Sequence, residues 1–549
     1  MVTEKQLETI VLDILEKKPL TKAEFDDIRR RASSKLGINQ PANRDVLRAY
    51  HDLIKKKRIA PAPEMEHLFM KAGIRSTSGI AVITSLLKPY TCPGKCIYCP
   101  TEVRMPKSYI ASEPAAARSL RLNFNPYLLM QKRIEMLEKN GHPTDKIEYI
   151  TKGGTWNAYP LKYQYWYILE SFKACNNLSR EIETPFTEEA YWNDKPLEAL
   201  MDAVDAEQIY NESADHRIIG ITLETRPDAI SPKSIYHMRR QGCTRVELGL
   251  QAPDDAILKL VHRGHTVDEF KIAMKLLRDA GFKVDLHFMP DLPGTTPAHD
   301  VEMYKLLFED TALRPDMVKI YPNTVIKSAE LYQWFLDGRY KPYGDEALFD
   351  ALLEMKKSTP RYCRISRLIR DIPATEIEAG NIVTNLREVL AHKMAKNGDT
   401  CECLRCREIS RHKNLVDAEQ VLFVDEYETV GGKEYFITFE DKDRTAVFGF
   451  LRLRIPTESN DALEKLMPEI KHAAFIRELH VYGQLVSIGE RDARASQHKG
   501  LGKKLVAEAE RIAAEQGFQR VAVISGVGVR GYYAKLGYTK EGTYMVKKN

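Results

Sequence analysis

The sequence predicts an α/β protein of several domains, in which a small helical module precedes a partial (β/α)6 barrel, a cysteine-rich linker and a second α/β domain. The 549 residues exceed what one hydrophobic core usually supports. Between residues 80 and 325, short β-branched runs alternate with amphipathic helical stretches, which indicates a parallel sheet wound with right-handed crossovers. Most of the nine cysteines fall into groups with the spacing of metal ligands.

Residues 1–75 are predicted to form a basic helical module. Apolar residues recur at helical spacing, for example at Leu7 and Ile10 and again at Val46 and Leu47. The first 60 residues hold 14 lysines and arginines against 9 acidic residues. Such a surplus can bind the phosphates of a nucleic acid, and it can equally be a solvated helix face, so composition leaves both interpretations open.

Residues 76–375 are predicted to form the barrel, with amphipathic helices such as 125–141 and 267–281 between its strands. Six strand-like runs are expected at 81–87, 146–151, 217–225, 245–251, 283–291 and 317–322. Functional side chains of such barrels lie at the carboxyl ends of the strands. The polar or otherwise unusual residues found at these ends are Gly153, Gly154, Thr155, Glu224, Arg226, Glu247, Gln251, His287 and Asp291.

The most informative motif for the chemistry is the group of three cysteines Cys92, Cys96 and Cys99. Three thiolates at C-x3-C-x2-C spacing ligate three irons of a [4Fe–4S] cluster and leave the fourth iron open. No further cysteine follows until Cys175, so the open iron is interpreted as a binding position for S-adenosylmethionine (SAM). This pattern is typical of radical SAM enzymes, with a zinc knuckle or three unrelated buried thiols as alternatives.

Residues 376–415 are predicted to be a zinc-binding linker. Cys401, Cys403 and Cys406 lie within six residues, and three cysteines plus one histidine suit a structural Zn²⁺ ion. His392 is the expected fourth ligand, and His412 is its rival for that position. Free surface thiols remain the alternative.

Residues 416–549 are predicted to form the second α/β domain, with several strands before a glycine turn and a helix. The turn places Gln497, Gly500 and Gly502 in the pattern [QR]-x-x-G-x-[GA]. Glycines at such a turn free backbone N–H groups to hold a pyrophosphate, as in acyl-CoA acetyltransferases of the GNAT fold. Tyr532 and Tyr533 follow on a short final helix.

The composition also indicates in which cellular compartment the protein is expected. Hydrophobic residues make up 43% and charged residues 29% of the chain, which is ordinary for a globular protein. No apolar stretch approaches the roughly 18 residues of a membrane span, and the first residues lack the regions of a signal peptide. The cysteine spacing argues against a disulfide framework. We therefore expect a cytoplasmic protein with no membrane partner.

In its order of modules the chain resembles the catalytic subunit of Elongator, the elongator protein three family, in an archaeal or bacterial form. The segments that carry the resemblance are PGKCIYCP, GGTWNAYP, ITLETRPD, CTRVELGLQ, RGHT, MPDLPG, RELHVYGQLV and SGVGVRGYY. The resemblance implies radical SAM chemistry on acetyl-CoA that attaches a carboxymethyl-type group to C5 of the wobble uridine, uridine 34, in a tRNA anticodon loop.

The resemblance also implies roles for single residues. Cys92, Cys96 and Cys99 would hold the cluster, while SAM would contact Gly153, Gly154, Glu224, Arg226, Glu247 and Gln251. Acetyl-CoA would contact Lys146, the strand Glu478, Leu479, His480 and Val481, and the turn residues Leu501, Gly502 and Lys503. Tyr533 is the candidate for hydrogen bonding to the thioester, with Tyr532 nearly as good a candidate.

The expected partners are tRNA, acetyl-CoA and an electron donor for the cluster. The accessory Elongator subunits are in doubt, because the cysteine-rich linker and the short cluster spacing differ from eukaryotic members. The basic module would then be part of the tRNA surface.

Two alternatives are kept. A protein or histone lysine acetyltransferase would use the C-terminal domain alone, with a structural cluster and Glu478, Glu490 or His480 as base. A noncatalytic tRNA-binding scaffold would have no reason to keep both cofactor motifs.

Overall fold

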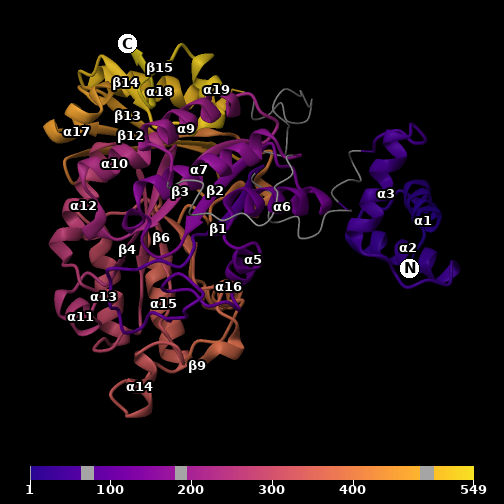
Figure 1. Ribbon diagram of the computed structural model, residues 1–549, viewed down its shortest axis with the longest axis horizontal. Coiled ribbons are helices and arrows are strands. Elements are labelled where there is room, and N and C mark those ends of the chain that lie inside the picture. Colours follow the sequence, from indigo (N-terminus) through magenta and orange to yellow (C-terminus); the bar gives the residue numbers. More distant parts are fainter. Residues whose placement is uncertain (1, 63–67, 69–78, 180–193, 483–499, 549) are drawn as a thin grey trace.

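The computed structural model describes residues 2–62, 68, 79–179, 194–482 and 500–548 (Figure 1). Three helices form the N-terminal module around an apolar core of their own: α1 (Glu4–Lys17), α2 (Lys22–Lys35) and α3 (Asn43–Lys55). Thr3 and Thr21 begin α1 and α2 with capping boxes, which satisfy the first backbone N–H groups of each helix. In Figure 1 this module lies to one side, next to α6 (Pro126–Lys139).

The central sheet has seven parallel strands in the order β1-β2-β3-β4-β5-β6-β8, as expected of a partial barrel. The strands are β1 (Ala81–Leu86), β2 (Lys146–Lys152), β3 (Arg217–Thr225), β4 (Cys243–Gln251), β5 (Lys283–Phe288), β6 (Met317–Ile320) and β8 (Arg364–Arg367). The six predicted strands are confirmed. The seventh, β8, was not predicted and extends the sheet beyond β6.

Helices cover the outside of this sheet and connect its strands (Figure 1). They are α5 (Pro114–Arg121), α6, α7 (Leu161–Asn176), α9 (Leu197–Asn211), α10 (Pro232–Arg240), α11 (Asp255–Leu260), α12 (Val267–Asp279), α13 (Pro297–Glu309) and α15 (Asp345–Ser358). Two further helices pack elsewhere: α14 (Leu331–Leu336) lies against residues 324–326, and α16 (Leu386–Asn397) lies against α15. A short antiparallel pair, β7 (Thr324–Ile326) and β9 (Ile377–Gly380), lies at the carboxyl end of the barrel.

The C-terminal part forms a second, mostly antiparallel sheet in the order β10-β11-β12-β13-β14-β16-β15. Its strands are β10 (Val421–Thr429), β11 (Gly432–Glu440), β12 (Val447–Pro456), β13 (Ala474–Val481), β14 (Arg520–Val523), β15 (Thr539–Glu541) and β16 (Tyr544–Lys548). Its helices are α17 (Asp461–Leu466), α18 (Leu501–Glu515) and α19 (Arg530–Ala534). Among its described strands only β13 and β14 pair in parallel, over three residue pairs.

The second sheet closes the amino end of the barrel. Asp316, just before β6, accepts hydrogen bonds from Arg278 of α12 at 3.1 Å and from Arg477 of β13 at 2.6 Å. Glu434 of β11 pairs with the same two arginines at 3.2 and 2.8 Å. All four side chains are fully buried. Charges so far from water need each other, so this network fixes the two sheets relative to one another.

Candidate active site

The three cysteines of the first group lie in the loop between β1 and α5, at the carboxyl end of the barrel. A hydrogen bond with Cys99 and the nearby Arg263 guanidinium lower the pKa of the Cys96 thiol to about 4. Arg263 Nη1 lies 3.5 Å from Cys96 Sγ, and Cys92 Sγ lies 3.7 Å from Thr155 Oγ1. A thiolate held beside a cation is the form that ligates iron, so the residues present fit an iron–sulfur cluster.

The residues expected to hold SAM surround this loop. Glu224 accepts a hydrogen bond from the Tyr109 hydroxyl at 2.6 Å, and Arg226 is held by Asp228 at 2.9 Å. Gly154 has a φ of 86°, a backbone conformation that a larger residue would adopt only with strain. Gly153 and Gly154 directly follow β2, and Gln251 is the last residue of β4, as expected.

A buried charge cluster fills the middle of the barrel, and it was only partly foreseen. Glu247 pairs with Lys319 and lies 3.3 Å from His287 Nε2 and 3.7 Å from Lys152 Nζ. Burial alone would raise the pKa of Glu247, but Lys152 and Lys319 hold it well below its usual value. Alternation along β2 and β6 places Lys152 and Lys319 in the lumen, although charged residues on strands usually indicate an outer, solvated face.

The β13 residues expected to contact acetyl-CoA lie at the other end of the barrel. Glu478 accepts a hydrogen bond from Arg452 Nε at 2.9 Å and pairs with Lys283, the first residue of β5, at 3.3 Å. Burial opposes ionisation of Glu478, yet Lys283 and Arg452 lower its pKa to about 2. Burial lowers the pKa of His480, so its imidazole is neutral at pH 7. Leu479 and Val481 continue the strand.

The glycine turn and the tyrosines complete this end. Gly500 precedes α18 with a φ of 95°, and Leu501, Gly502 and Lys503 form its first turn. A Cβ at Gly502 would clash with the Tyr532 hydroxyl, so the glycine allows close packing there. Tyr533 is buried, and burial raises the pKa of its phenol, which therefore stays protonated. Gln497 lies outside the described residues.

One cavity of about 1080 Å³ connects the two ends. At one end it is lined by Cys92, Cys96, Cys99, Gly154, Glu224, Arg226 and Gln251, and at the other by Glu478, Leu479, His480 and Tyr533, with Glu247 between them. The other residues within the described ranges that are expected to contact SAM or acetyl-CoA are not part of this lining: Lys146, Gly153, Val481, Gly500, Leu501, Gly502, Lys503 and Tyr532. Lys146 begins β2 and lies 3.5 Å from the carboxylate of Asp145.

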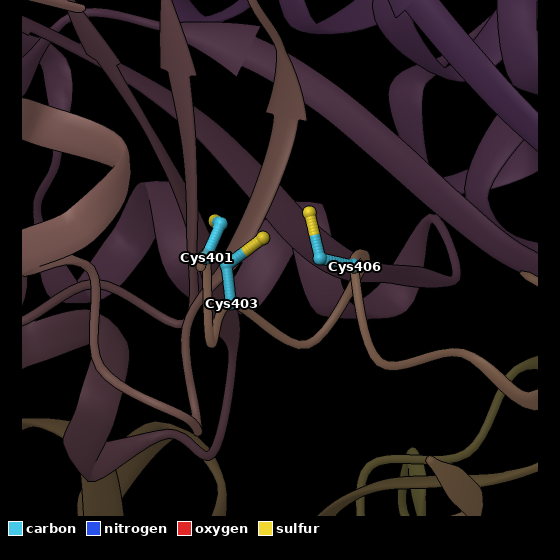
Figure 2. Close-up of side chains that lie close together, drawn as sticks. All are labelled: Cys401, Cys403 and Cys406. Atoms are coloured by element: carbon cyan, nitrogen blue, oxygen red, sulfur yellow. The ribbon is translucent and has the colours of Figure 1, made fainter. Parts of the chain in front are cut away.

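The second cysteine group also converges. The sulfur atoms of Cys401, Cys403 and Cys406 lie within 4.8 Å of one another (Figure 2). Hydrogen bonds from Cys401 and Cys406 hold the pKa of Cys403 well below its usual value, which suits a metal ligand. Within the described ranges neither expected histidine joins this group: His412 Nε2 lies 2.9 Å from the Cys406 carbonyl oxygen, and His392 is exposed.

The barrel, the cysteine loop and the second sheet together define a radical SAM enzyme joined to an acetyltransferase of the GNAT type. Models of three families agree: the radical SAM superfamily matches residues 87–307, its C-terminal domain 315–396, and the GNAT acetyltransferase family 405–538.

Comparison with whole proteins narrows this class to one family. A tRNA uridine(34) acetyltransferase of Methanocaldococcus infernus is 40% identical over 99% of this chain and 98% of its own. One from Dehalococcoides mccartyi is 39% identical over 87% of this chain and 99% of its own, and human Elongator complex protein 3 is 34% identical over 95% and 93%. The chain belongs to this family, the catalytic subunits of Elongator and their archaeal and bacterial relatives.

A solved structure agrees with this assignment. The archaeal Methanocaldococcus infernus Elp3 with its N-terminus deleted is 38% identical and aligns with a TM-score of 0.71, over 86% of this chain and all of that one. Among the described residues, no helix has the length and apolarity needed to cross a membrane.

Proposed function

We propose that this chain attaches a carboxymethyl-type group, derived from acetyl-CoA, to C5 of the wobble uridine of tRNA. The observation that carries the proposal is the shared cavity, because the cluster cysteines and the acetyl-CoA strand line the same space of about 1080 Å³. A reaction that needs both cofactors on one substrate requires such a connection. The archaeal and bacterial relatives are tRNA uridine(34) acetyltransferases by name, which supports uridine 34 as the site of reaction.

Cys92, Cys96 and Cys99 would hold a [4Fe–4S] cluster, and SAM would be bound by Gly153, Gly154, Glu224, Arg226, Glu247 and Gln251. When bound, the two cofactors supply a carbon radical that can take a hydrogen atom from an unactivated methyl group. The protein's own part is to orient them. Tyr109 fixes the Glu224 carboxylate, and Asp228 fixes the Arg226 guanidinium, so both side chains are preorganised.

At the other end, acetyl-CoA would lie along the backbone of Glu478, Leu479, His480 and Val481. Gln497, Gly500, Leu501, Gly502 and Lys503 would hold its pyrophosphate at the start of α18, where the first backbone N–H groups have no partner within the helix. The protonated phenol of Tyr533 would donate a hydrogen bond to the thioester oxygen as charge develops there. Tyr532 and Lys146 are the secondary contacts of this assignment.

The two described candidates for the base of the lysine acetyltransferase alternative, Glu478 and His480, are poorly suited to that role. With two cationic partners and a pKa of about 2, Glu478 is too weak a base to take a proton from an ammonium group. His480 is buried beside Phe450 and Tyr482, where taking up a proton is disfavoured. Glu490 lies outside the described residues.

The remaining assignments extend the proposal. We assign residues 1–75 to tRNA binding, 76–375 to radical SAM chemistry, 376–415 to a zinc-binding linker and 416–549 to acetyl-CoA binding. Zn²⁺ would bind Cys401, Cys403 and Cys406, with His392 or His412 as fourth ligand after a side-chain rearrangement. An electron donor for the cluster and a cytoplasmic location complete the assignment, and no accessory subunit is required.

Nucleoside analysis tests the proposal. The anaerobically reconstituted protein is incubated with SAM, acetyl-CoA, a reductant and tRNA, and the tRNA is then digested and analysed by mass spectrometry. A carboxymethyl-type mass gain on uridine 34 that disappears with Cys96→Ser is expected. Acetyl-CoA turnover stimulated by histone peptides but not by tRNA would instead favour the acetyltransferase alternative.

A further inference from the structure

An exposed aromatic ring stands immediately before the cluster loop. Tyr90 lies between β1 and Cys92, and 43% of its surface is exposed. Its ring stacks on Tyr159 with a centroid distance of 4.8 Å and an interplanar angle of 28°. Tyr159 in turn stacks on Tyr163 at 5.2 Å and 21°. Tyr90 is therefore the outer end of a stack of three rings.

The inner rings of this stack are fixed. Tyr159 and Tyr163 are buried, and the Tyr159 hydroxyl donates a hydrogen bond to the carbonyl oxygen of Lys88 at 2.7 Å. The backbone N–H of Lys88 donates to the Tyr163 hydroxyl at 3.2 Å. Two tyrosines thus anchor the backbone two residues before Tyr90. A ring mounted on such a support loses little conformational entropy when a ligand stacks on it.

The position of the ring relates it to the reaction. Tyr90 is two residues from Cys92, which bounds their Cα separation at roughly 7 Å, and Cys92 lines the cavity. On the other side of Cys92, Lys95 is exposed and makes no ion pair with any residue of the described ranges. An exposed aromatic face and a cation beside the same cysteine match a nucleobase and its phosphate.

We propose that Tyr90 is a stacking platform for the RNA base next to the uridine that enters the cavity. The inference rests on the proposed function. A base can enter the cavity only if it leaves the stack of its loop, and its neighbour then has an uncovered face. Stacking on Tyr90 would cover that face and hold the loop with the uridine directed at the cluster, while Lys95 would contact the adjoining phosphate. Stacking does not depend on which base it is, so the platform would serve tRNAs of different anticodon sequence.

The test measures the affinity of the full protein for anticodon stem-loop RNA by fluorescence anisotropy at one fixed salt concentration. Three RNAs are compared. One is the intact loop, the second has an abasic site at the nucleotide before the wobble uridine, and the third has an abasic site at the nucleotide after it. Tyr90→Ala and Tyr90→Leu remove the aromatic face, and the leucine still packs on Tyr159. Tyr90→Phe keeps the face. Tyr210→Ala removes a tyrosine of α9 that is 62% exposed and serves as the matched control.

The alanine and leucine variants should bind the intact loop about ten-fold more weakly, whereas Tyr90→Phe and Tyr210→Ala should bind like the unaltered protein. One of the abasic loops should bind all five proteins with nearly the same affinity, because the stacked base is already missing. If Tyr90→Ala binds the intact loop with the same affinity as the unaltered protein and still modifies tRNA, the stacking proposal is overturned. The proposed function would then still stand. The stacking proposal would also be overturned if the Tyr90→Ala and Tyr90→Leu variants lost the same amount of affinity for all three RNAs. It would likewise be overturned if these variants lost affinity for SAM and kept their affinity for RNA. If the unaltered protein neither binds nor modifies tRNA, the proposed function itself fails.

Discussion

Glu478 offers a quantitative test of how β13 is held to the barrel. Its carboxylate lies 2.9 Å from Arg452 Nε and 3.3 Å from Lys283 Nζ, with 11% of the side chain exposed. Lowering of its pKa from 4.5 to about 2 corresponds to about 3 kcal/mol of stability at neutral pH. We therefore expect Glu478→Gln to lower the free energy of unfolding by about 3 kcal/mol at pH 7.

The pH dependence of this loss has a definite sign. A carboxyl group whose pKa is depressed in the folded protein stabilises the fold above its unfolded pKa. The stabilisation is lost as the pH falls toward the folded value, here about 2. The difference between the unaltered protein and Glu478→Gln should therefore be constant between pH 6 and 8. By pH 4 it should have decreased by on the order of 1 kcal/mol.

Urea unfolding followed by circular dichroism at pH 7 and pH 4 measures both quantities. Asp337→Asn is the control, because Asp337 is an exposed carboxylate paired with Arg339, and its replacement should leave the free energy of unfolding nearly unchanged. A Glu478→Gln variant as stable as the unaltered protein at pH 7, or one whose deficit grows as the pH falls, would refute the reasoning.

Three further predictions concern the cofactors. Cys96→Ser should lack the absorbance of a four-iron cluster and should not cleave SAM when reduced; a variant that still modifies tRNA would contradict the cluster assignment. Tyr533→Phe should lower the rate of acetyl-CoA turnover by roughly 10²-fold with little change in the Kd for acetyl-CoA, whereas an unchanged rate would remove Tyr533 from the chemistry. Cys403→Ser should reduce the zinc content, measured by mass spectrometry of metals, and lower the Tm; retention of a full equivalent of zinc would rule out this site.

The sequence predicted the strands well where both faces are buried. All six expected strands, the short β6 included, contain β-branched runs because their outer faces pack on helices. The seventh strand, β8, was missed because the run Arg364–Arg367 carries two arginines in four residues. Tertiary pairing with β6, rather than local composition, makes this segment a strand.

The sequence also located both ends of the candidate site, since cysteine spacing and a glycine turn are local signals. The sequence did not predict the ion pairs in the middle of the cavity. Lys152 and Lys319 come from strands far apart in the chain, and their pairing with Glu247 depends on the register of the sheet. Tyr90 was overlooked for a similar reason, because its stacking partner Tyr159 follows 69 positions later.

The central claim is that acetyl-CoA and SAM react within one cavity, and isotope transfer tests it most directly. Reduced protein is given tRNA, SAM and acetyl-CoA whose methyl group carries deuterium, and the 5′-deoxyadenosine formed is analysed by mass spectrometry. We predict deuterium in 5′-deoxyadenosine and a partly deuterated side chain on uridine 34. Modified tRNA accompanied by unlabelled 5′-deoxyadenosine would contradict the account.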